Sequence, residues 1–217
     1  MKTLLTTITL LLTTFSIFAQ QDQDPEAKAI LDKTKAQIES YTNITADFEL
    51  TIKNKRENIN STTTGTIYLK DSLYAIESPG SRVVYDGEQL WTYTEDINEV
   101  TITEPSDDDS FTDNPAMIFS FYERDFKFRL RGTETIDGKT MDVIDLYPKN
   151  LNTPYSRYKI YIDRLSGNIY SVEAISKDGI DYSAKITNTN TTKTIEPEKL
   201  TFDVKKHPDI EVVNMRF

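Results

Sequence analysis

Few side chains in this sequence have the type and spacing that catalysis requires. The chain of 217 residues contains one histidine, His207, and no cysteine. His207 stands between two lysines and a proline, a polar context typical of a surface loop, so we do not expect it at the centre of a catalytic triad. The absence of cysteine from the sequence excludes thiolate nucleophiles, disulfides and zinc–thiolate sites. The sequence also lacks a phosphate-binding glycine loop, a nucleophile elbow and a dinucleotide-binding fingerprint.

Carboxylates are the remaining candidates for chemistry, because paired acids can catalyse hydrolysis. Asp47, Glu49, Asp142 and Asp145 alternate with apolar residues, so we expect them on the solvated face of strands. The run at 107–109 offers three aspartates for calcium, but it lacks the glycine and the distal glutamate of an EF-hand loop, and a solvated loop is the preferred interpretation. We therefore predict no enzyme, no metal and no cofactor, and keep an envelope hydrolase as the weakest alternative.

The composition is that of a globular protein with an acidic surface. Hydrophobic residues make up 37% of the chain and charged residues 28%, which is enough for one domain with a sizeable core. The formal net charge is −10. An anionic surface repels phosphate backbones and anionic headgroups, so we expect no nucleic-acid partner and no permanent adsorption to a membrane.

The first 19 residues have the pattern of a secretory signal. Lys2 is followed by an apolar stretch from Leu4 to Phe18, and Ala19 precedes an abruptly polar segment. A membrane anchor is the alternative, but the apolar run is shorter than the roughly 20 residues that a membrane span requires, and it contains threonines. We predict a signal peptide over residues 1–19, one domain over 20–217, and a soluble protein in a bacterial periplasm. No cysteine follows the signal, so we expect no lipid anchor on an N-terminal cysteine.

Around these side chains the sequence predicts one helix followed by many strands. Asp24 and Pro25 form a helix start, and apolar residues then recur at three- and four-residue spacing up to Tyr41. From Ile44 to Ile52 the period changes to two, which is typical of a strand with one apolar face. Short gaps with turn residues imply antiparallel hairpins between the strands that follow. We expect these strands at residues 62–70, 72–77, 82–85, 89–94, 99–103, 126–131, 139–147, 157–163, 169–176 and 180–187, followed by an extended piece at 200–204 and a further edge at 210–213.

A second, short helix is expected from Ala116 to Tyr122, and its residues are apolar almost all round. Such a helix must be buried or contact an apolar partner. About ten or eleven strands form a sheet that two helices cannot cover completely. We therefore expect a mainly β fold, a partly closed antiparallel β-barrel, with the N-terminal helix and the short second helix at its mouth and an apolar cavity inside.

Three stretches of the chain carry a resemblance to a known family. They are GTIYLKDSLYAIESP from Gly65 to Pro79, VVYDGEQLWTYTEDINEVTI from Val83 to Ile102, and NPAMIF from Asn114 to Phe119. In this order they resemble the LolA-type outer-membrane lipoprotein carriers of the bacterial periplasm. The block D-G-x-x-L-W-x-Y is the most specific part of the match, whereas the C-terminal half agrees only in its strand pattern and in its F-x-V ending.

The resemblance implies a half-open barrel with a helical lid, which shields the acyl chains of lipoproteins and moves them from the inner to the outer membrane. The implied partners are acylated lipoproteins, an inner-membrane lipoprotein-releasing transporter and an outer-membrane acceptor, and the carrier is expected to be a monomer. Where family members carry an Arg-Pro pair whose arginine bonds to the lid, this chain has Lys70 and Asp71. Lys70 is the candidate lid contact. This departure leaves open a lipid- or glycolipid-binding or sensor module on the same fold, without catalysis.

The candidate acyl-chain site combines the apolar strand faces with the lid. Strand alternation does not distinguish a packed core from an open lining, and for Trp91 and Tyr93 both interpretations stay open. With the resemblance, the predicted ligand-binding residues of the cavity and lid are Phe48, Leu50, Ile67, Leu69, Tyr74, Ile76, Trp91, Tyr93, Met117, Phe119 and Phe121.

Overall fold

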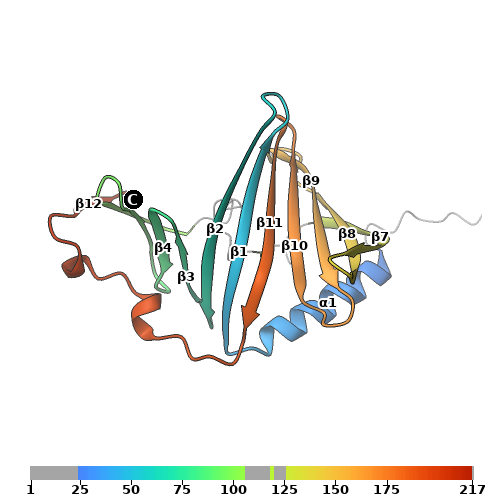
Figure 1. Cartoon of the computed structure of the whole chain (residues 1–217), viewed down its shortest axis with the longest axis horizontal. Coiled ribbons are helices and arrows are strands. Elements are labelled where there is room, and N and C mark those ends of the chain that lie inside the picture. The colour runs from blue at the N-terminus through green and yellow to red at the C-terminus, as the bar shows by residue number, and fades with distance from the viewer. Residues whose placement is uncertain (1–23, 106–117, 120–125, 217) are drawn as a thin grey trace, which may run out of the picture.

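The computed structural model describes residues 24–105, 118–119 and 126–216. The expected signal peptide at 1–19 lies outside these residues, as does most of the expected helix at 116–122. Over the described residues the fold is mainly β, with the helix α1 (Pro25–Glu39) and one twelve-stranded sheet whose two edges do not join (Figure 1). The predicted half-open β fold with an N-terminal helix is confirmed.

The strands follow the order β12-β6-β5-β4-β3-β2-β1-β11-β10-β9-β8-β7 across the sheet. Neighbouring strands are antiparallel, except that β12 pairs parallel with β6. The strand bounds are β1 (Asn43–Asn54), β2 (Ile59–Lys70), β3 (Leu73–Ser78), β4 (Ser81–Tyr85), β5 (Leu90–Thr94), β6 (Glu99–Thr103), β7 (Phe126–Ile136), β8 (Lys139–Pro148), β9 (Tyr155–Asp163), β10 (Ile169–Ser176), β11 (Ile180–Asn190) and β12 (Glu211–Asn214).

The cap of α1 also ties the helix to the sheet. Asp24 Oδ1 accepts hydrogen bonds from the backbone N–H groups of Glu26 (3.0 Å) and Ala27 (3.3 Å), as its place before a proline predicts. Asp24 Oδ2 accepts a further bond from the N–H of Leu130 in β7, at 3.0 Å. Burial tends to raise the pKa of Asp24, but these backbone donors outweigh it and lower that pKa. The ionised carboxylate therefore fixes the start of α1 on an edge strand.

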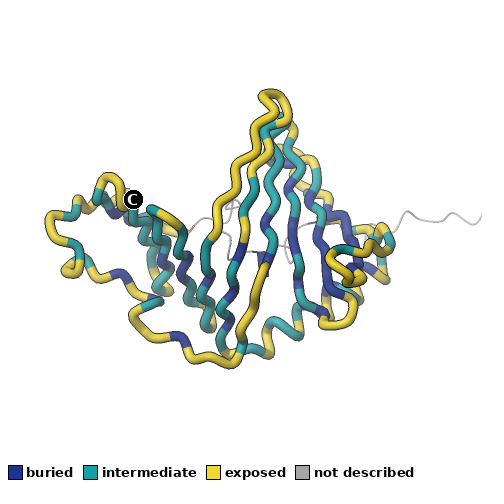
Figure 2. The backbone as a smooth tube through the Cα atoms, viewed as in Figure 1, coloured by how far each residue is buried: buried dark blue, intermediate teal, exposed yellow. Residues whose placement is uncertain are grey.

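The two faces of the sheet have different coverings. We call the face on which α1 packs the inner face, and the opposite one the outer face. In β1 and β2 the buried residues lie at the end away from the hairpin that joins them, whereas the tip of this hairpin is exposed (Figure 2). The buried residues of the inner face and its coverings, here the inner cluster, are Ala27, Leu31, Ile44, Ala46, Phe48, Ile67, Ile76, Ile118, Phe119, Phe126, Ile144, Leu146, Tyr155, Tyr158, Ile160, Ile162, Ile169, Val172, Ala174, Ala184 and Ile186.

The C-terminal segment covers the outer face of β2 to β6 and forms a second core there, the outer cluster. Its buried members are Ala75, Val84, Val100, Ile195, Leu200 and Phe202. The extended piece expected at 200–204 is observed at its centre, where residues 201–203 run extended between the short 3₁₀ helices η3 (Pro197–Leu200) and η4 (Val204–Lys206) and pair with no described strand. The alternation of Leu200 and Phe202 reflects packing onto the sheet rather than pairing within it.

Two carboxylates that we expected on a solvated face are buried, and for them that prediction is wrong. Asp142 is 5% exposed and Asp145 is 0% exposed. Asp142 Oδ1 accepts hydrogen bonds from Arg164 Nη2 (2.6 Å) and Nε (2.9 Å). Asp145 Oδ2 accepts hydrogen bonds from Arg157 Nη1 (3.2 Å) and from the Tyr147 hydroxyl (3.0 Å). Alternation with apolar residues does not imply solvation here, because charged and polar partners cover both carboxylates.

Candidate functional site

The candidate site is the inner face over β1 to β3, where apolar side chains converge from neighbouring strands. The register aligns Ala46, Ile67 and Ile76 across the three strands, and Phe48 follows Ala46 on the same face of β1. Phe48, Ile67 and Ile76 are 3%, 0% and 4% exposed. A surface of this kind contacts apolar groups without requiring a particular sequence or polar group, since hydrophobic contact is not directional.

Two residues from the segment between β6 and β7 complete this surface. Ile118 is fully buried and Phe119 is 8% exposed, and both belong to the inner cluster together with Phe48, Ile67 and Ile76. They are the two described residues of the expected lid helix at 116–122. Ile118 and Phe119, which belong to no strand of the sheet, therefore contribute a buried apolar pair to the same core as three strands.

Three further predicted residues are partly buried and pack against the inner cluster. Leu69 and Tyr74 face each other across β2 and β3, and Leu50 lies farther along β1 than Phe48, toward the hairpin tip. Met117 and Phe121 lie outside the described residues. The structure thus brings together seven of the predicted residues, namely Phe48, Leu50, Ile67, Leu69, Tyr74, Ile76 and Phe119.

Trp91 and Tyr93 lie on the other side of the sheet, against the outer cluster. The ring centroid of Phe202 is 5.8 Å from that of Trp91 and 5.6 Å from that of Tyr93. His207 stacks on Phe202 at 4.9 Å between ring centroids, so the single histidine of the sequence is part of the same aromatic group. The structure therefore separates Trp91 and Tyr93 from the seven inner-face residues, and it packs them between the sheet and the C-terminal segment.

The D-G-x-x-L-W pattern has a local structural reason. Asp86 Oδ1 accepts the N–H groups of Glu88 (3.0 Å) and Gln89 (2.9 Å), while Oδ2 accepts the indole N–H of Trp91 at 2.8 Å. Gly87 has a φ of 98°, in the left-handed region that favours glycine. Burial tends to raise the pKa of Asp86, but the hydrogen bonds from Gln89, Trp91 and Glu88 outweigh it and lower that pKa. One carboxylate therefore closes the turn and orients the indole.

Sequence reasoning missed a group of aromatic residues on the inner face of the other half of the sheet. Ring centroids lie 5.4 Å apart for Phe126 and Tyr158, 5.2 Å apart for Tyr155 and Tyr158, and 6.2 Å apart for Tyr155 and Tyr182. All four side chains pack in or against the inner cluster. The sequence pattern indicates this apolar face, because every second residue from 158 to 162 is aromatic or aliphatic.

Lys70 lies on the outer face of β2. It follows Leu69 of the inner face, and the register aligns it with Leu73, which packs against the outer cluster. Phe119 belongs to the inner cluster. The lid contact of Lys70 stays a prediction, since most of the expected lid lies outside the described residues.

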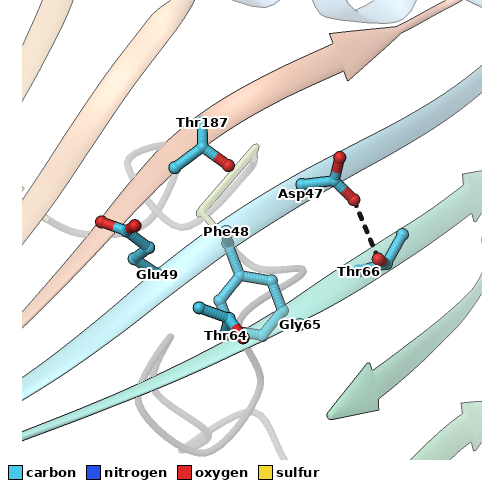
Figure 3. A pocket seen from close by; sticks show the side chains of 7 residues that line it. All are labelled: Asp47, Phe48, Glu49, Thr64, Gly65, Thr66 and Thr187. Carbon is cyan, nitrogen blue, oxygen red and sulfur yellow. Dashed lines mark hydrogen bonds between the residues drawn. The ribbon is translucent and has the colours of Figure 1, made fainter.

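A shallow depression of about 310 Å³ lies on the outer face behind Phe48, with a largely polar lining (Figure 3). Asp47 lies at its edge, where Asp47 Oδ1 accepts a hydrogen bond from Thr66 Oγ1 at 2.9 Å and Oδ2 accepts one from Asn188 Nδ2 at 3.2 Å. Among the residues that the structure describes, no three acidic, histidine or cysteine side chains come together as metal ligands. Nor does that part of the chain contain a helix with the length and hydrophobicity of a membrane span.

Comparison with known proteins identifies the family. Residues 39–203 match the family described as outer membrane lipoprotein carrier protein LolA, and the chain belongs to this family. A comparison with curated protein sequences gave no significant match. Among solved structures, an uncharacterized conserved protein from Thermus thermophilus shares the fold, with a TM-score of 0.57 and 15% identity over 87% of this chain and 99% of that one. A LolA superfamily protein from Nitrosomonas europaea gives a TM-score of 0.45 and 11% identity over 82% of this chain and 98% of that one.

Proposed function

We propose that the protein is a periplasmic carrier, which shields the acyl chains of lipoproteins and moves them from the inner to the outer membrane. Membership of the LolA family supports this function. The observation that carries it is the burial of Ile118 and Phe119 in one cluster with Phe48, Ile67 and Ile76. Because Ile118 and Phe119 belong to no strand, an apolar ligand can take their place without breaking any strand pairing.

The free energies of exchanging Ile118 and Phe119 for an acyl chain allow both uptake and release of that chain. Burying one methylene group contributes about 0.8 kcal/mol, so a single long acyl chain is stabilised on the order of 10 kcal/mol by leaving water. Displacing a buried isoleucine and a buried phenylalanine costs roughly 3–6 kcal/mol. The acyl chain therefore displaces Ile118 and Phe119 from the inner face. Competition from the displaced pair weakens acyl-chain binding and favours release to an acceptor.

The proposed transport route has three partners besides the carrier. An inner-membrane lipoprotein-releasing transporter supplies an acylated lipoprotein, the monomeric carrier shields its acyl chains in the periplasm, and an outer-membrane acceptor receives it. In this proposal a signal peptide at 1–19 directs export, residues 20–217 form the carrier domain, and the protein acts without a cofactor. Phe48, Leu50, Ile67, Leu69, Tyr74 and Ile76 are the proposed contacts with the acyl chains, and Phe119 is the proposed lid residue that competes with the acyl chains for this surface.

A second candidate is a lipid- or glycolipid-binding or sensor module on the same fold, without catalysis. The position of Lys70 favours it, because Lys70 replaces the arginine expected to latch the lid and lies on the outer face. A module that keeps one lipid bound has less need of such a latch. Mass spectrometry of material copurified from the periplasm separates the two functions, since a carrier retains acylated protein and a module retains lipid alone.

Uptake of a fluorescent probe with a 16-carbon acyl chain tests the inner face directly. Phe119→Ala removes most of the competing side chain, so we expect the variant to bind the probe about ten to a hundred times more tightly. Leu200→Ala is the matched control, because Leu200 is likewise buried, at 3% exposed, but lies in the outer cluster. An affinity that is unchanged in Phe119→Ala, or raised equally in both variants, contradicts the proposal.

A further inference from the structure

The outer face of β7 to β9 carries a concentration of positive charge on a protein whose formal net charge is −10. Lys127, Arg129 and Arg131 come from β7, and Arg157 and Lys159 come from β9. The strand β8 lies between them. We call these five side chains the basic patch.

The buried carboxylate of Asp145 lies at the centre of the basic patch. Asp145 of β8 is aligned with Arg129 on one side and with Lys159 on the other. Its Oδ2 atom lies 3.2 Å from Arg157 Nη1 and 3.6 Å from Arg131 Nε. The Asp145 side chain is 0% exposed, whereas that of Arg131 is 50% exposed, so the cations cover the carboxylate and present their own charge to solvent.

The described acids that border the patch are fewer than its five cations. Asp24 interacts electrostatically with Arg129, and Glu173 of β10 is aligned with Lys159. Within the described part of the chain, the five cations stand against four carboxylates, those of Asp145, Asp24, Glu173 and Glu134, the last of which acts electrostatically on Tyr161 of β9. Over the whole chain, by contrast, acids exceed bases. Lys127, Arg129 and Arg131 belong to an edge strand, which leaves the side chains of β7 without a further strand beside them.

An exposed apolar side chain adjoins the basic patch. Leu151, in the loop between β8 and β9, is 78% exposed. The Lys177 ammonium braces this loop by donating hydrogen bonds to the backbone carbonyls of Leu151 (2.6 Å) and Thr153 (2.8 Å). Tyr147, at the end of β8 beside the loop, is 37% exposed. The loop thus presents a leucine next to an amphipathic ring and a group of cations.

We propose that the basic patch and Leu151 dock the protein on an anionic lipid bilayer. Long cationic side chains on a sheet face match the dispersed phosphates of headgroups, a tyrosine suits the headgroup level, and a leucine suits the acyl boundary beneath it. The cations come from β7 and β9, on either side of β8, and this spread over one face suits an array of headgroups better than a single extended acidic peptide. The anionic bilayer repels the remaining acidic surface of the protein, so docking is oriented, with the inner face turned away from the bilayer. Docking that rests on charge is also reversible and sensitive to salt.

Cosedimentation with vesicles tests this docking. The protein is mixed with phosphatidylglycerol–phosphatidylcholine vesicles and with pure phosphatidylcholine vesicles, at low and at high salt. We expect binding to the anionic vesicles alone, and its loss at high salt. The triple variant Lys127→Gln, Arg129→Gln, Lys159→Gln keeps the two arginines that contact Asp145, and we expect it to bind on the order of a hundredfold more weakly.

Two controls make the result specific. The triple variant Lys193→Gln, Lys205→Gln, Lys206→Gln removes the same charge from the C-terminal segment, and we expect it to bind no more than a few times more weakly. Leu151→Ser keeps the backbone carbonyl that Lys177 binds, and we expect severalfold weaker binding with an unchanged salt dependence. Circular dichroism verifies that each variant is folded.

Several outcomes would overturn the proposal. Equal losses in the two triple variants would show a general charge effect, and equal binding to neutral vesicles would exclude recognition of anionic headgroups. Competition by millimolar inorganic phosphate would assign the patch to free phosphate, and patch-dependent binding of a polyglutamate peptide without vesicle binding would assign it to an acidic protein. The vesicles contain no acylated protein, so these outcomes are independent of the carrier function.

Discussion

The aromatic ring of Phe48 lies on the backbone of Gly65, its partner across β1 and β2. A Cβ atom on Gly65 would lie 2.7 Å from the ring atoms Cε1 and Cζ, and 2.5 Å from the carbonyl oxygen of Glu77 in β3. Glycine in the interior of a strand ordinarily weakens it, but here it marks a close approach of another group to the backbone. The missing side chain gives the phenylalanine room on the inner face.

We expect Gly65→Ala to destabilise the fold, because the new methyl group must displace either the Phe48 ring or the β3 backbone. Overpacking of this kind costs about 1–3 kcal/mol of the free energy of unfolding, measured by urea denaturation. Thr63→Ala, on the same face of the same strand but exposed, is the control and should change it by less than about 0.5 kcal/mol. Equal stabilities for wild type and Gly65→Ala would show that Phe48 is not held by this contact.

The hydrogen bond from Trp91 to Asp86 makes the turn at Asp86 sensitive to acid. The pKa of Asp86 is lowered in the folded protein, so its bonds stabilise the fold above the ordinary aspartate pKa, and this stabilisation is lost as the pH falls through the lowered pKa. Trp91 is the single tryptophan of the chain, so its fluorescence reports on the turn. We expect a change in its emission below about pH 4, and we expect Asp86→Asn to lack that step. The same acid transition in both proteins would contradict this assignment.

Removing the cap of α1 should loosen both the helix and the edge strand that it contacts. Asp24→Ala deletes an acceptor shared by the N–H groups of Glu26, Ala27 and Leu130, so we expect a loss of about 1–2 kcal/mol in the free energy of unfolding. Hydrogen exchange should become faster at the Leu130 amide. Asp32→Ala, on the exposed side of the same helix, should cost about 0.5 kcal/mol or less and leave that amide protected.

The buried Asp145 depends on its cationic partners. Arg157→Met removes the cation 3.2 Å from Asp145 Oδ2, and because Arg131 and the Tyr147 hydroxyl still contact this carboxylate we expect a cost of about 1–3 kcal/mol. Adding Asp145→Asn removes the charge itself, so the double variant should recover part of the loss in a double-mutant cycle. Lys193→Met, an exposed cation of the C-terminal segment away from Asp145, is the control. Additive losses from Arg157→Met and Asp145→Asn would show that the two side chains are not coupled.

The order of elements could be predicted from the sequence because periodicity reports on local structure. The spacing of three and four in the N-terminal helix and the alternation from Ile44 to Ile52 both correspond to the observed elements. The C-terminal segment could not be placed in this way. Leu200, Phe202 and Val204 alternate whether they pair within a sheet or pack upon it, and only the tertiary structure distinguishes the two.

The side of the sheet on which a residue lies could be predicted only in part. Phe48 and Ile67 share a face because β1 and β2 form one hairpin, whose register follows from its short turn. Trp91 is three strands farther from β2, where the C-terminal segment forms a second core on the outer face, so hydrophobicity alone gives no sign of which face is inner. Alternation likewise did not reveal that Asp145 is buried, because the pattern does not show which side chains cover the face on which Asp145 lies.

The central claim is that acyl chains bind the inner face, and adjacent residues of β2 provide its most direct test. A photo-crosslinking amino acid replaces Leu69, which packs against the inner cluster, or Tyr68, which packs against the outer cluster. After irradiation of living cells, crosslinked products are analysed for acylated lipoproteins. We expect such products from position 69 and none from position 68. Products of equal yield from both positions, or from position 68 alone, would contradict the claim.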